Sequence, residues 1–592
     1  MTPAAPPAAA TGAAPASPYA ARPWLARLSP AQRAPVQPPP SVLEAFREAA
    51  VRAPGRTALA YFDGRISYAE AAALSDSAAA HLAARGVRRG DRVAVALQNT
   101  PHFVLAVLAA WKAGAVVVPL NPMYKSAEAR HVLRDCGAVA LVCAGPAWTA
   151  YLREAADGSA VHTVLTAAEL DLQTRDDPRL LALTAAPQGP QPAKPRAAAG
   201  PQAQPDPRPA SPRGEVRPHT ADFTSVARRG DRPPADPRLT AEDIALISYT
   251  SGTSGTPKGA MNPHGALTYN AVRQVSGHPV PEGAAYFALA PLFHITGMVC
   301  ELAACFANAG TLVLAHRFDA GLVLDAFLEH RPAYTIGPAT AFMALAAHPG
   351  ATRDHFASFR VVSSGGAPLP PALVERLRAD FGFYLRNGYG LTECTAPCAS
   401  VPAHLEAPVD PASGTLSVGV PGAGTAVRIL DARGGEAPLG EAGEIAVRGP
   451  QVVPGYWGLP EDTAAAFPDG ELRTGDIGFM DADGWLYVVD RKKDMINASG
   501  FKVWPREVED VLYTHPAVRE AAVVGVPDPY RGESVKAYVS LRPGASADPA
   551  ELSAYCAARL AAYKYPRQVE ILPVLPKTTS GKILRRELRD RG

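Results

Sequence analysis

The sequence predicts an α/β protein: a large N-terminal domain of parallel-rich sheets covered by helices, with a β-rich subregion, followed by a smaller, mobile α+β C-terminal domain. Three observations predict this class. The 592 residues exceed one ordinary domain, and 47% of them are hydrophobic, which is enough for two or more cores. Short apolar strand patterns alternate with segments of helical spacing. A charged run at residues 490–494 separates the two predicted domains.

The parallel sheet is predicted by a βαβ pattern in the first part of the chain. Residues 92–97 are typical of a buried strand, residues 102–113 have helical spacing, and residues 115–120 predict the next strand. Such a unit implies parallel strands with helical cover. Similar alternation recurs at residues 311–314, 333–336 and 360–363.

Two segments are predicted to be disordered. Residues 1–40 form an Ala/Pro-rich leader, and residues 173–238 form a Pro-rich insertion with few aromatic residues. Neither composition can bury enough apolar surface to offset the entropy of ordering. The large domain is therefore expected to span residues 41–490 around that insertion. Residues 491–592 are expected to form the small domain.

Composition narrows the function classes. Lys+Arg 58 against Asp+Glu 56 gives a formal net charge of +2, which offers no broad electrostatic footprint for nucleic acid. An apolar run of about 18 residues, as a membrane span needs, is absent from the sequence. The seven cysteines lack a disulfide-framework pattern, so reduced thiols in a cytoplasm are expected.

The string YTSGTSGTPKG at residues 249–259 predicts a phosphate-binding loop. Glycines let backbone N–H groups approach phosphate, while hydroxyls and a lysine add donors and charge. The loop is not a Walker loop, because Pro257 precedes Lys258 and Gly259 follows it. The candidate nucleotide-binding residues are Thr250, Ser251, Gly252, Thr253, Ser254, Gly255 and Lys258.

Four further blocks follow in order: GYGLTE at residues 388–393, RTGD at 473–476, DRKKD at 490–494 and PKTTSGK at 576–582. Together with the phosphate loop they resemble the adenylate-forming superfamily of acyl-CoA synthetases, luciferases and peptide-synthetase adenylation domains. The resemblance runs from about Ser41 to Lys582. It implies ATP, Mg²⁺ and CoA as cofactors.

The resemblance also assigns the nucleotide contacts. It implies that Gly366, Ala367 and Pro368 border adenine and that Tyr389, followed by Gly390, offers an aromatic face. Its other implied contacts are the Thr392 hydroxyl on the α-phosphate, Glu393 as a Mg²⁺ ligand together with Thr253, Asp476 on the ribose hydroxyls, and Arg491 on the ribose-phosphate side.

Lys582 is the candidate catalytic lysine. A carboxylic acid is already an anion at neutral pH, so activating it needs no general base. The difficulty is to bring that anion to an anionic phosphate, which a lysine and a metal ion can ease. By resemblance the small domain rotates about Lys493 and exchanges Lys582 for a face that carries Ser499, Gly500 and Lys502, which border CoA.

By resemblance, PLFHITGM at residues 291–298 falls at the acyl pocket. Relatives that activate amino acids place an aspartate here, whereas this chain has Phe293 and His294, which argues against an amino acid. His294 is predicted to be a gate or pocket wall, with a core histidine bonded to backbone as the alternative. Gly297, Gly337 and Pro338 complete the predicted pocket. The small side chains after Gly337 favour a long apolar slot.

The sequence therefore predicts an AMP-forming acyl-CoA synthetase for a medium- or long-chain fatty acid. An aryl-CoA ligase of the coumarate or benzoate type, an acyl-AMP ligase feeding a carrier protein, and a catalytically silent nucleotide- or acyl-CoA-binding homologue are the alternatives. The predicted partners are a small carboxylic acid, ATP and CoA. Transient contact with a membrane surface, and a monomeric or homodimeric state, are left open by the sequence.

Overall fold

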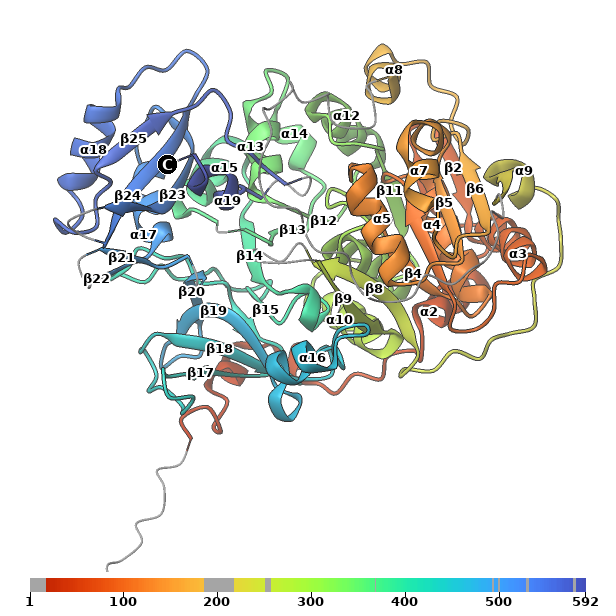
Figure 1. Ribbon diagram of the computed structural model, residues 1–592, viewed down its shortest axis with the longest axis horizontal. Coiled ribbons are helices and arrows are strands. Elements are labelled where there is room, and N and C mark those ends of the chain that lie inside the picture. Colours follow the sequence, from red (N-terminus) through yellow and green to blue (C-terminus); the bar gives the residue numbers. More distant parts are fainter. Residues whose placement is uncertain are drawn as a thin grey trace, which may run out of the picture.

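The computed structural model describes residues 17–185, 218–250, 257–367, 369–491, 494–498, 501–528, 532–578 and 582–591. Two α/β sheets form the body of the large domain, an antiparallel sheet lies beside them, and a fourth sheet forms the small domain. Figure 1 shows the small domain in blue at one end of the molecule and strands β4, β5 and β6 of the seven-stranded sheet in orange near the other. The predicted fold class is confirmed.

The seven-stranded sheet contains the predicted βαβ unit. Its order is β7-β6-β5-β3-β4-β8-β9, and every neighbouring pair is parallel except β8 and β9. Its strands are β3 (Arg92–Ala96), β4 (Val116–Pro119), β5 (Ala140–Ala144), β6 (Thr163–Ala167), β7 (His219–Asp222), β8 (Ile244–Thr250) and β9 (Lys258–Pro263).

Helices cover this sheet, and α4 is buried along its whole length, as an all-round apolar helix must be. The helices are α3 (Tyr68–Ala84), α4 (Pro101–Lys112), α5 (Ser126–Asp135), α6 (Gly145–Ala147), η2 (Trp148–Leu152) and α7 (Arg153–Ala156).

The nine-stranded sheet has the order β16-β15-β14-β13-β12-β10-β11-β1-β2, with parallel pairing from β14 through β1. One apolar core spans this sheet and the seven-stranded sheet. Its strands are β1 (Thr57–Tyr61), β2 (Gly64–Ser67), β10 (Ala285–Phe287), β11 (Thr311–Leu314), β12 (Tyr334–Gly337), β13 (Val361–Ser364), β14 (Leu385–Tyr389), β15 (Ala399–Ser400) and β16 (Val420–Pro421).

The helices that accompany the nine-stranded sheet include a π-helix, η3, directly after the predicted acyl loop. They are α2 (Val42–Arg52), α10 (His264–Gly277), η3 (Gly297–Ala303), α11 (Ala304–Ala307), α12 (Ala320–His330), α13 (Ala339–Ala347), α14 (Arg353–Phe356) and α15 (Pro371–Phe381). Among the described residues, the structure has no helix with the length and apolar character that a membrane span requires.

The remaining strands form the β-rich subregion and the small domain, each with its own apolar core. The subregion contains β17 (Ala426–Leu430), β18 (Gly443–Arg448), α16 (Pro460–Ala466), η5 (Pro468–Gly470), β19 (Leu472–Met480) and β20 (Leu486–Arg491). The small domain contains β21 (Ile496–Ala498), β22 (Phe501–Val503), α17 (Pro505–Tyr513), β23 (Val518–Asp528), β24 (Gly532–Leu541), α18 (Pro549–Ala557), β25 (Gln568–Ile571) and α19 (Arg585–Arg589).

The structure differs from the predicted disorder in the second half of the leader. Residues 17–40 include η1 (Pro23–Arg27) and α1 (Pro30–Arg33). Trp24 is fully buried against the β-rich subregion, and the Tyr19 hydroxyl donates to the Ala437 carbonyl at 2.8 Å. Trp24 and Tyr19 supply buried apolar area that the average Ala/Pro-rich composition of the leader does not reveal.

The predicted insertion is also ordered at both ends. It contains α8 (Pro178–Ala185), β7 and α9 (Phe223–Ala227). β7 adds a parallel edge strand to β6, and Phe223, the first residue of α9, is buried. Residues 186–217, the most Pro-rich part of the predicted insertion, lie outside the described residues.

Candidate active site

The predicted motifs follow the carboxyl ends of parallel strands. The phosphate loop follows β8, the acyl loop follows β10, the adenine strip follows β13 and GYGLTE begins in β14. In open α/β sheets, ligands bind at this edge because the loops converge there. A cleft at this edge of the nine-stranded sheet is lined by residues of β12, β13 and β14 and of the helices α10 and η3.

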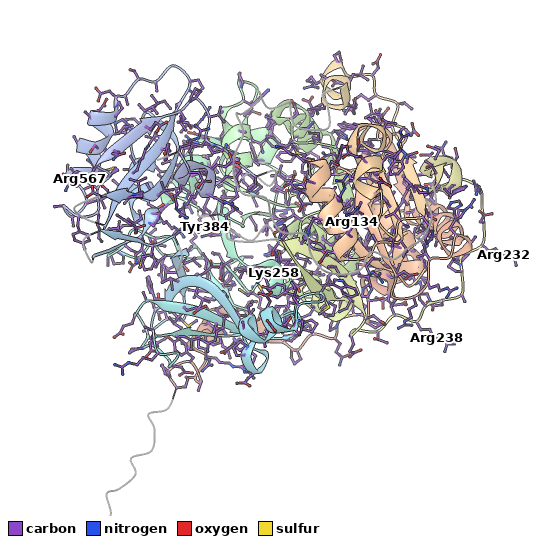
Figure 2. All side chains as sticks on the ribbon, in the orientation of Figure 1. Arg134, Arg232, Arg238, Lys258, Tyr384 and Arg567 are labelled. Atoms are coloured by element: carbon purple, nitrogen blue, oxygen red, sulfur yellow. The ribbon has the colours of Figure 1, made fainter. Side chains whose placement is uncertain are left out.

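The phosphate loop is described only at its two ends. Thr250 and Lys258 pair across β8 and β9, and the Thr250 hydroxyl donates to the Lys258 carbonyl at 3.4 Å. The Lys258 ammonium forms an ion pair with Asp462. Figure 2 places Lys258 centrally in the molecule, near α16. Ser251, Gly252, Thr253, Ser254 and Gly255 lie outside the described residues.

Glycine is required at two positions around the predicted adenine site, for different reasons. Gly366 follows β13 with φ +79°, and a Cβ there would meet nothing within 4 Å, so conformation rather than space requires glycine. Gly390 differs, because its Cβ would lie 2.8 Å from Pro397 Cα. Ala367 closes the described part of the strip, and Pro368 lies outside the described residues.

The predicted ribose site joins two motifs that are distant in sequence. The Tyr389 hydroxyl donates to Asp476 Oδ2 at 2.7 Å, and both side chains are buried. Burial, followed by the nearby Asp476 charge, holds the pKa of Tyr389 well above its ordinary value, so the hydroxyl stays a donor. Backbone pairing places Arg491 of β20 opposite Asp476 of β19.

The GYGLTE segment is held in place by backbone contacts. Glu393 and Thr392 begin the short helix η4 (Thr392–Cys394). Asn262 donates to the Thr392 carbonyl at 2.9 Å, and the Val453 N–H donates to the Glu393 carbonyl at 3.0 Å. The Tyr456 hydroxyl, which the sequence gives no reason to select, donates to Glu393 Oε1 at 2.9 Å.

Glu393 suits a metal ion that arrives with a nucleotide. Mg²⁺ is usually held by one or two carboxylates and by substrate phosphates, not by an all-protein cage. Within the described ranges, no three His, Cys, Asp or Glu side chains cluster as a metal site. One carboxylate beside the phosphate loop therefore fits the donor set that Mg²⁺ takes when phosphates supply the rest.

Lys582 of the small domain lies within electrostatic range of His294 in the large domain. The Thr296 N–H donates to His294 Nδ1 at 3.3 Å, so the neutral ring carries its proton on Nε2. Burial first, and the positive charge of Lys582 second, lower the pKa of His294 to about 4. The backbone N–H of Lys582 donates to the Thr578 hydroxyl at 3.0 Å, which fixes the position of this residue in the segment.

The acyl side of the cleft is more polar than the sequence suggests. Its lining includes Gln274 and His278 of the α10 end, Thr296, Tyr334 and Ser363. The rings of His278 and Tyr334 stack with centroids 5.5 Å apart. Burial lowers the pKa of His278 to about 4, so the ring is neutral at physiological pH.

Neighbouring groups occupy the space beside the two glycines of the predicted acyl pocket. A Cβ on Gly337 would lie 2.7 Å from Leu289 Cδ2, so Leu289 fills the space that the glycine leaves. A Cβ on Gly297 would lie 2.4 Å from the Pro291 carbonyl oxygen, so glycine permits the tight turn of the acyl loop. Pro338 follows β12 as the N-cap of α13.

Glu301 is a buried carboxyl group that sequence reasoning missed. It lies on η3 with no exposed surface, and its Oε1 accepts the N–H groups of Leu289 at 3.0 Å, Ala290 at 3.3 Å and Ile336 at 3.3 Å. Burial raises the pKa of Glu301 well above its ordinary value. A single buried side chain therefore ties the chain after β10 and strand β12 to the π-helix behind the acyl loop.

The predicted hinge and CoA residues are described in part. Lys493, Ser499 and Gly500 lie outside the described residues, and the backbone of Lys502 pairs with Asn497 between β21 and β22. Next to the predicted hinge residue Lys493, Asp494 pairs with two arginines of the segment that follows Lys582. Arg589 contacts it at 3.0 Å and Arg585 at 3.6 Å.

Replacing Arg585 with alanine is expected to destabilise the small domain by roughly 3–5 kcal/mol, because a buried charge loses its partner. The Arg585 guanidinium also contacts both oxygens of buried Glu509, at 2.9 and 2.7 Å. Thermal unfolding and limited proteolysis would measure the loss. Arg589→Ala is the matched control: its side chain is 41% exposed, so its loss should cost at most about 1 kcal/mol. Equal effects of the two variants would contradict this assignment.

Comparisons with known proteins agree with this geometry. The AMP-binding enzyme family model matches residues 46–457, and the AMP-binding enzyme C-terminal domain model matches residues 507–582. A long-chain-fatty-acid–CoA ligase of Bacillus subtilis (strain 168) is 34% identical over 577 residues, covering 96% of this chain and 97% of that protein. A feruloyl-CoA synthase of Amycolatopsis sp is 37% identical over 542 residues, covering 91% and 96%.

A solved structure of the same overall fold has a nucleotide bound. ATP-bound MatB from Rhodopseudomonas palustris superposes with a TM-score of 0.77 at 28% sequence identity. The match covers 93% of this chain and 98% of that one. The likeness therefore extends over both domains of the described structure.

Proposed function

Since the chain belongs to the AMP-binding enzyme family and is an acid–thiol ligase of the AMP-forming acyl-CoA synthetase type, we propose the following two-step reaction. A carboxylate oxygen bonds to the α-phosphorus of ATP while the bond to pyrophosphate breaks, which gives acyl-AMP. The sulfur of CoA then bonds to the acyl carbon while the bond to AMP breaks, which gives the thioester. The observation that carries the proposal is the set of contacts that join the motifs: Tyr389 donates to Asp476, and Asn262 of the strand after the phosphate loop donates to the Thr392 carbonyl.

The first step needs charge stabilisation more than proton transfer. Both reacting groups are anions, so a cation near the transferring phosphoryl group lowers the barrier. In this proposal Lys582 supplies that charge and the Thr392 hydroxyl donates to the α-phosphate. His294 is neutral, since its pKa is lowered to about 4, so the ring acts as a wall of the acyl site and not as a second cation.

The nucleotide is proposed to lie along the described strip. Adenine borders Gly366 and Ala367 and faces Tyr389, while Asp476 accepts hydrogen bonds from the ribose hydroxyls. The Tyr389–Asp476 contact supports this role, because it fixes the carboxylate before the nucleotide binds. Lys258 and the rest of the phosphate loop are proposed to hold the outgoing phosphates.

Glu393 is the residue proposed to hold Mg²⁺, with Thr253 as a second ligand. When bound, Mg²⁺ supplies positive charge to the phosphates and orients them. Thr392 is the neighbour of Glu393 in η4, so one short helix would present both the phosphate donor and the metal ligand.

CoA is proposed as the acceptor, in agreement with the names of the full-length relatives. Rotation about Lys493 would withdraw Lys582 and present Ser499, Gly500 and Lys502 to the thiol. The alternative acceptor is a carrier protein, in which case acyl-AMP would be formed without thioester from free CoA.

The lining of the cleft favours an aryl acid with a polar ring substituent. The side chains of Gln274, His278 and Tyr334 line the acyl side, and an alkyl chain would leave such buried polar groups without compensation, at about 1–3 kcal/mol for each unsatisfied group. A medium- or long-chain fatty acid is the second candidate, which the Bacillus subtilis relative favours.

A panel of acids tests this choice. Thioester formation with benzoate, 4-hydroxybenzoate, coumarate, ferulate, octanoate and palmitate would be followed by mass spectrometry with ATP, Mg²⁺ and CoA. We expect the highest kcat/KM with a hydroxylated aryl acid. Gln274→Leu and His278→Leu should each lower that value about tenfold while changing benzoate little, because benzoate lacks the polar substituent. The highest kcat/KM with palmitate, or equal losses for all acids in both variants, would favour the fatty-acid candidate.

A further inference from the structure

A short segment of the β-rich subregion is fixed onto the strand that follows the phosphate loop. The Met261 N–H donates to the Gly455 carbonyl at 3.0 Å, and the Trp457 N–H donates to the Gly259 carbonyl at 2.8 Å. Ala260 and Tyr456 thereby form an antiparallel bridge. The position of Tyr456 is thus set by the backbone of β9, and not by its own side chain alone.

The Tyr456 side chain contacts two groups that face the proposed phosphates. Its hydroxyl donates to Glu393 Oε1 at 2.9 Å. The Lys258 ammonium lies 5.4 Å from the centre of its ring, within the range of a cation–π interaction. The ring also packs against Phe467, with ring centroids 5.5 Å apart. One aromatic residue therefore holds a carboxylate and a cation at once.

The hydroxyl of Tyr456 is the donor of this hydrogen bond, and the carboxylate oxygen of Glu393 is the acceptor. A protonated phenol that donates to an ionised carboxylate makes a charge-assisted bond, which is stronger and more directional than a neutral one. Such a bond fixes the rotamer of Glu393 without removing its negative charge.

The Lys258 ammonium is paired with a nearby carboxylate. Asp462, on α16, forms the ion pair with Lys258, and the Thr463 hydroxyl accepts the N–H of Tyr456 at 3.0 Å. The same turn of chain therefore places Tyr456 under Lys258 and supplies an anion to it. In a site for ATP, a phosphate oxygen would replace this carboxylate.

We infer that Tyr456 is a positioning residue that orients Glu393 for Mg²⁺ and Lys258 for the phosphates, and so couples the binding of metal and nucleotide. This inference rests on the proposed function, because it assumes that Glu393 and Lys258 face Mg²⁺ and ATP. Residues that orient a metal ligand through hydrogen bonds commonly change metal affinity by about 10- to 100-fold when they are lost.

The test is a thermodynamic coupling measured without turnover. Isothermal titration calorimetry would give the Kd of ATP in the presence of Mg²⁺ and in the presence of EDTA, without acid or CoA. The ratio of the two constants is the coupling between metal and nucleotide. Tyr456→Phe keeps the ring and removes the hydroxyl, so we expect this ratio to fall about tenfold while the Kd in EDTA changes little.

Two further variants separate positioning from general stability. Tyr487→Phe is the matched control, since it removes another partly buried tyrosine–carboxylate hydrogen bond of the same subregion, to Asp481 at 3.2 Å, and should leave the ratio unchanged. Tyr456→Leu also removes the ring beneath Lys258 and should weaken ATP binding in EDTA as well. Melting temperatures of all three variants would show that each one folds.

The outcomes distinguish the inference from the function on which it rests. An unchanged coupling ratio in Tyr456→Phe, with wild-type protein that binds ATP more tightly in Mg²⁺, would overturn the positioning role and leave the proposed function intact. A wild-type protein that binds no ATP under either condition would overturn the proposed function itself, and the inference with it. A fall of the ratio in Tyr487→Phe equal to that in Tyr456→Phe would also overturn the positioning role.

Discussion

Replacing Lys582 with alanine is expected to slow adenylation by about 10²- to 10³-fold, as the loss of one electrostatic contact to a developing charge does in other enzymes. The charge of Lys582 contributes to the lowered pKa of His294, so this cation of the small domain acts within electrostatic range of the acyl loop. No role in the second step is proposed for Lys582. Thioester formation from supplied acyl-AMP and CoA should therefore persist.

The two half-reactions would be measured separately. ATP–pyrophosphate exchange with the acid reports the first step, and thioester formed from synthetic acyl-AMP reports the second. Lys577→Ala is the matched control, because Lys577 belongs to the same segment but pairs with Glu520 of the small domain. Its exchange rate should stay near the wild-type value. Equal losses in both half-reactions of Lys582→Ala would contradict a role confined to adenylation.

Replacing Glu301 with leucine is expected to lower the free energy of unfolding of the large domain by several kcal/mol. The carboxyl oxygen accepts three backbone N–H groups, and each buried donor left without an acceptor costs about 1–3 kcal/mol. Glu301→Gln should be far milder, because the amide oxygen can accept the same bonds. Urea unfolding, followed through the transition of the large domain, would measure both.

The same pair of variants should show a pH dependence of defined sign. The pKa of Glu301 is raised in the folded state, so its contribution to stability is complete below the unfolded carboxyl pKa of about 4.3. That contribution is lost as pH rises through the folded pKa. Glu301→Gln lacks this loss, so its stability relative to wild type should increase from pH 5 to pH 9. A constant or opposite difference would contradict a protonated Glu301.

Much of the fold could be predicted because the buried strands are short, apolar and local in sequence. The predicted strand at residues 311–314 coincides with β11, and the predicted βαβ unit is β3, α4 and β4 within one or two residues at each end. Disorder was harder to delimit. Trp24 and Phe223 order their segments through contacts with distant chain, which composition averaged over a window does not reveal.

The same distinction between local sequence and distant contacts applies to the residues of the candidate site. Residues within contiguous motifs, such as Glu393 and Asp476, could be selected from sequence because each motif combines glycines, hydroxyls and charges in a short loop. Glu301 and Tyr456 could not, because their partners lie elsewhere in the chain and only the tertiary structure brings them together. The one sequence signal for Glu301 is a single acidic residue within an otherwise apolar helical segment, because a charge is costly to bury.

The most direct test of the central claim is a two-stage incubation of the purified protein followed by mass spectrometry. In the first stage the protein receives ATP, Mg²⁺ and a hydroxylated aryl acid without CoA, and CoA is added in the second. The account predicts acyl-AMP and pyrophosphate before CoA is added, then thioester and AMP in equal amounts afterwards. Thioester formed together with ADP and phosphate, or acyl-AMP that persists unchanged after CoA is added, would contradict it.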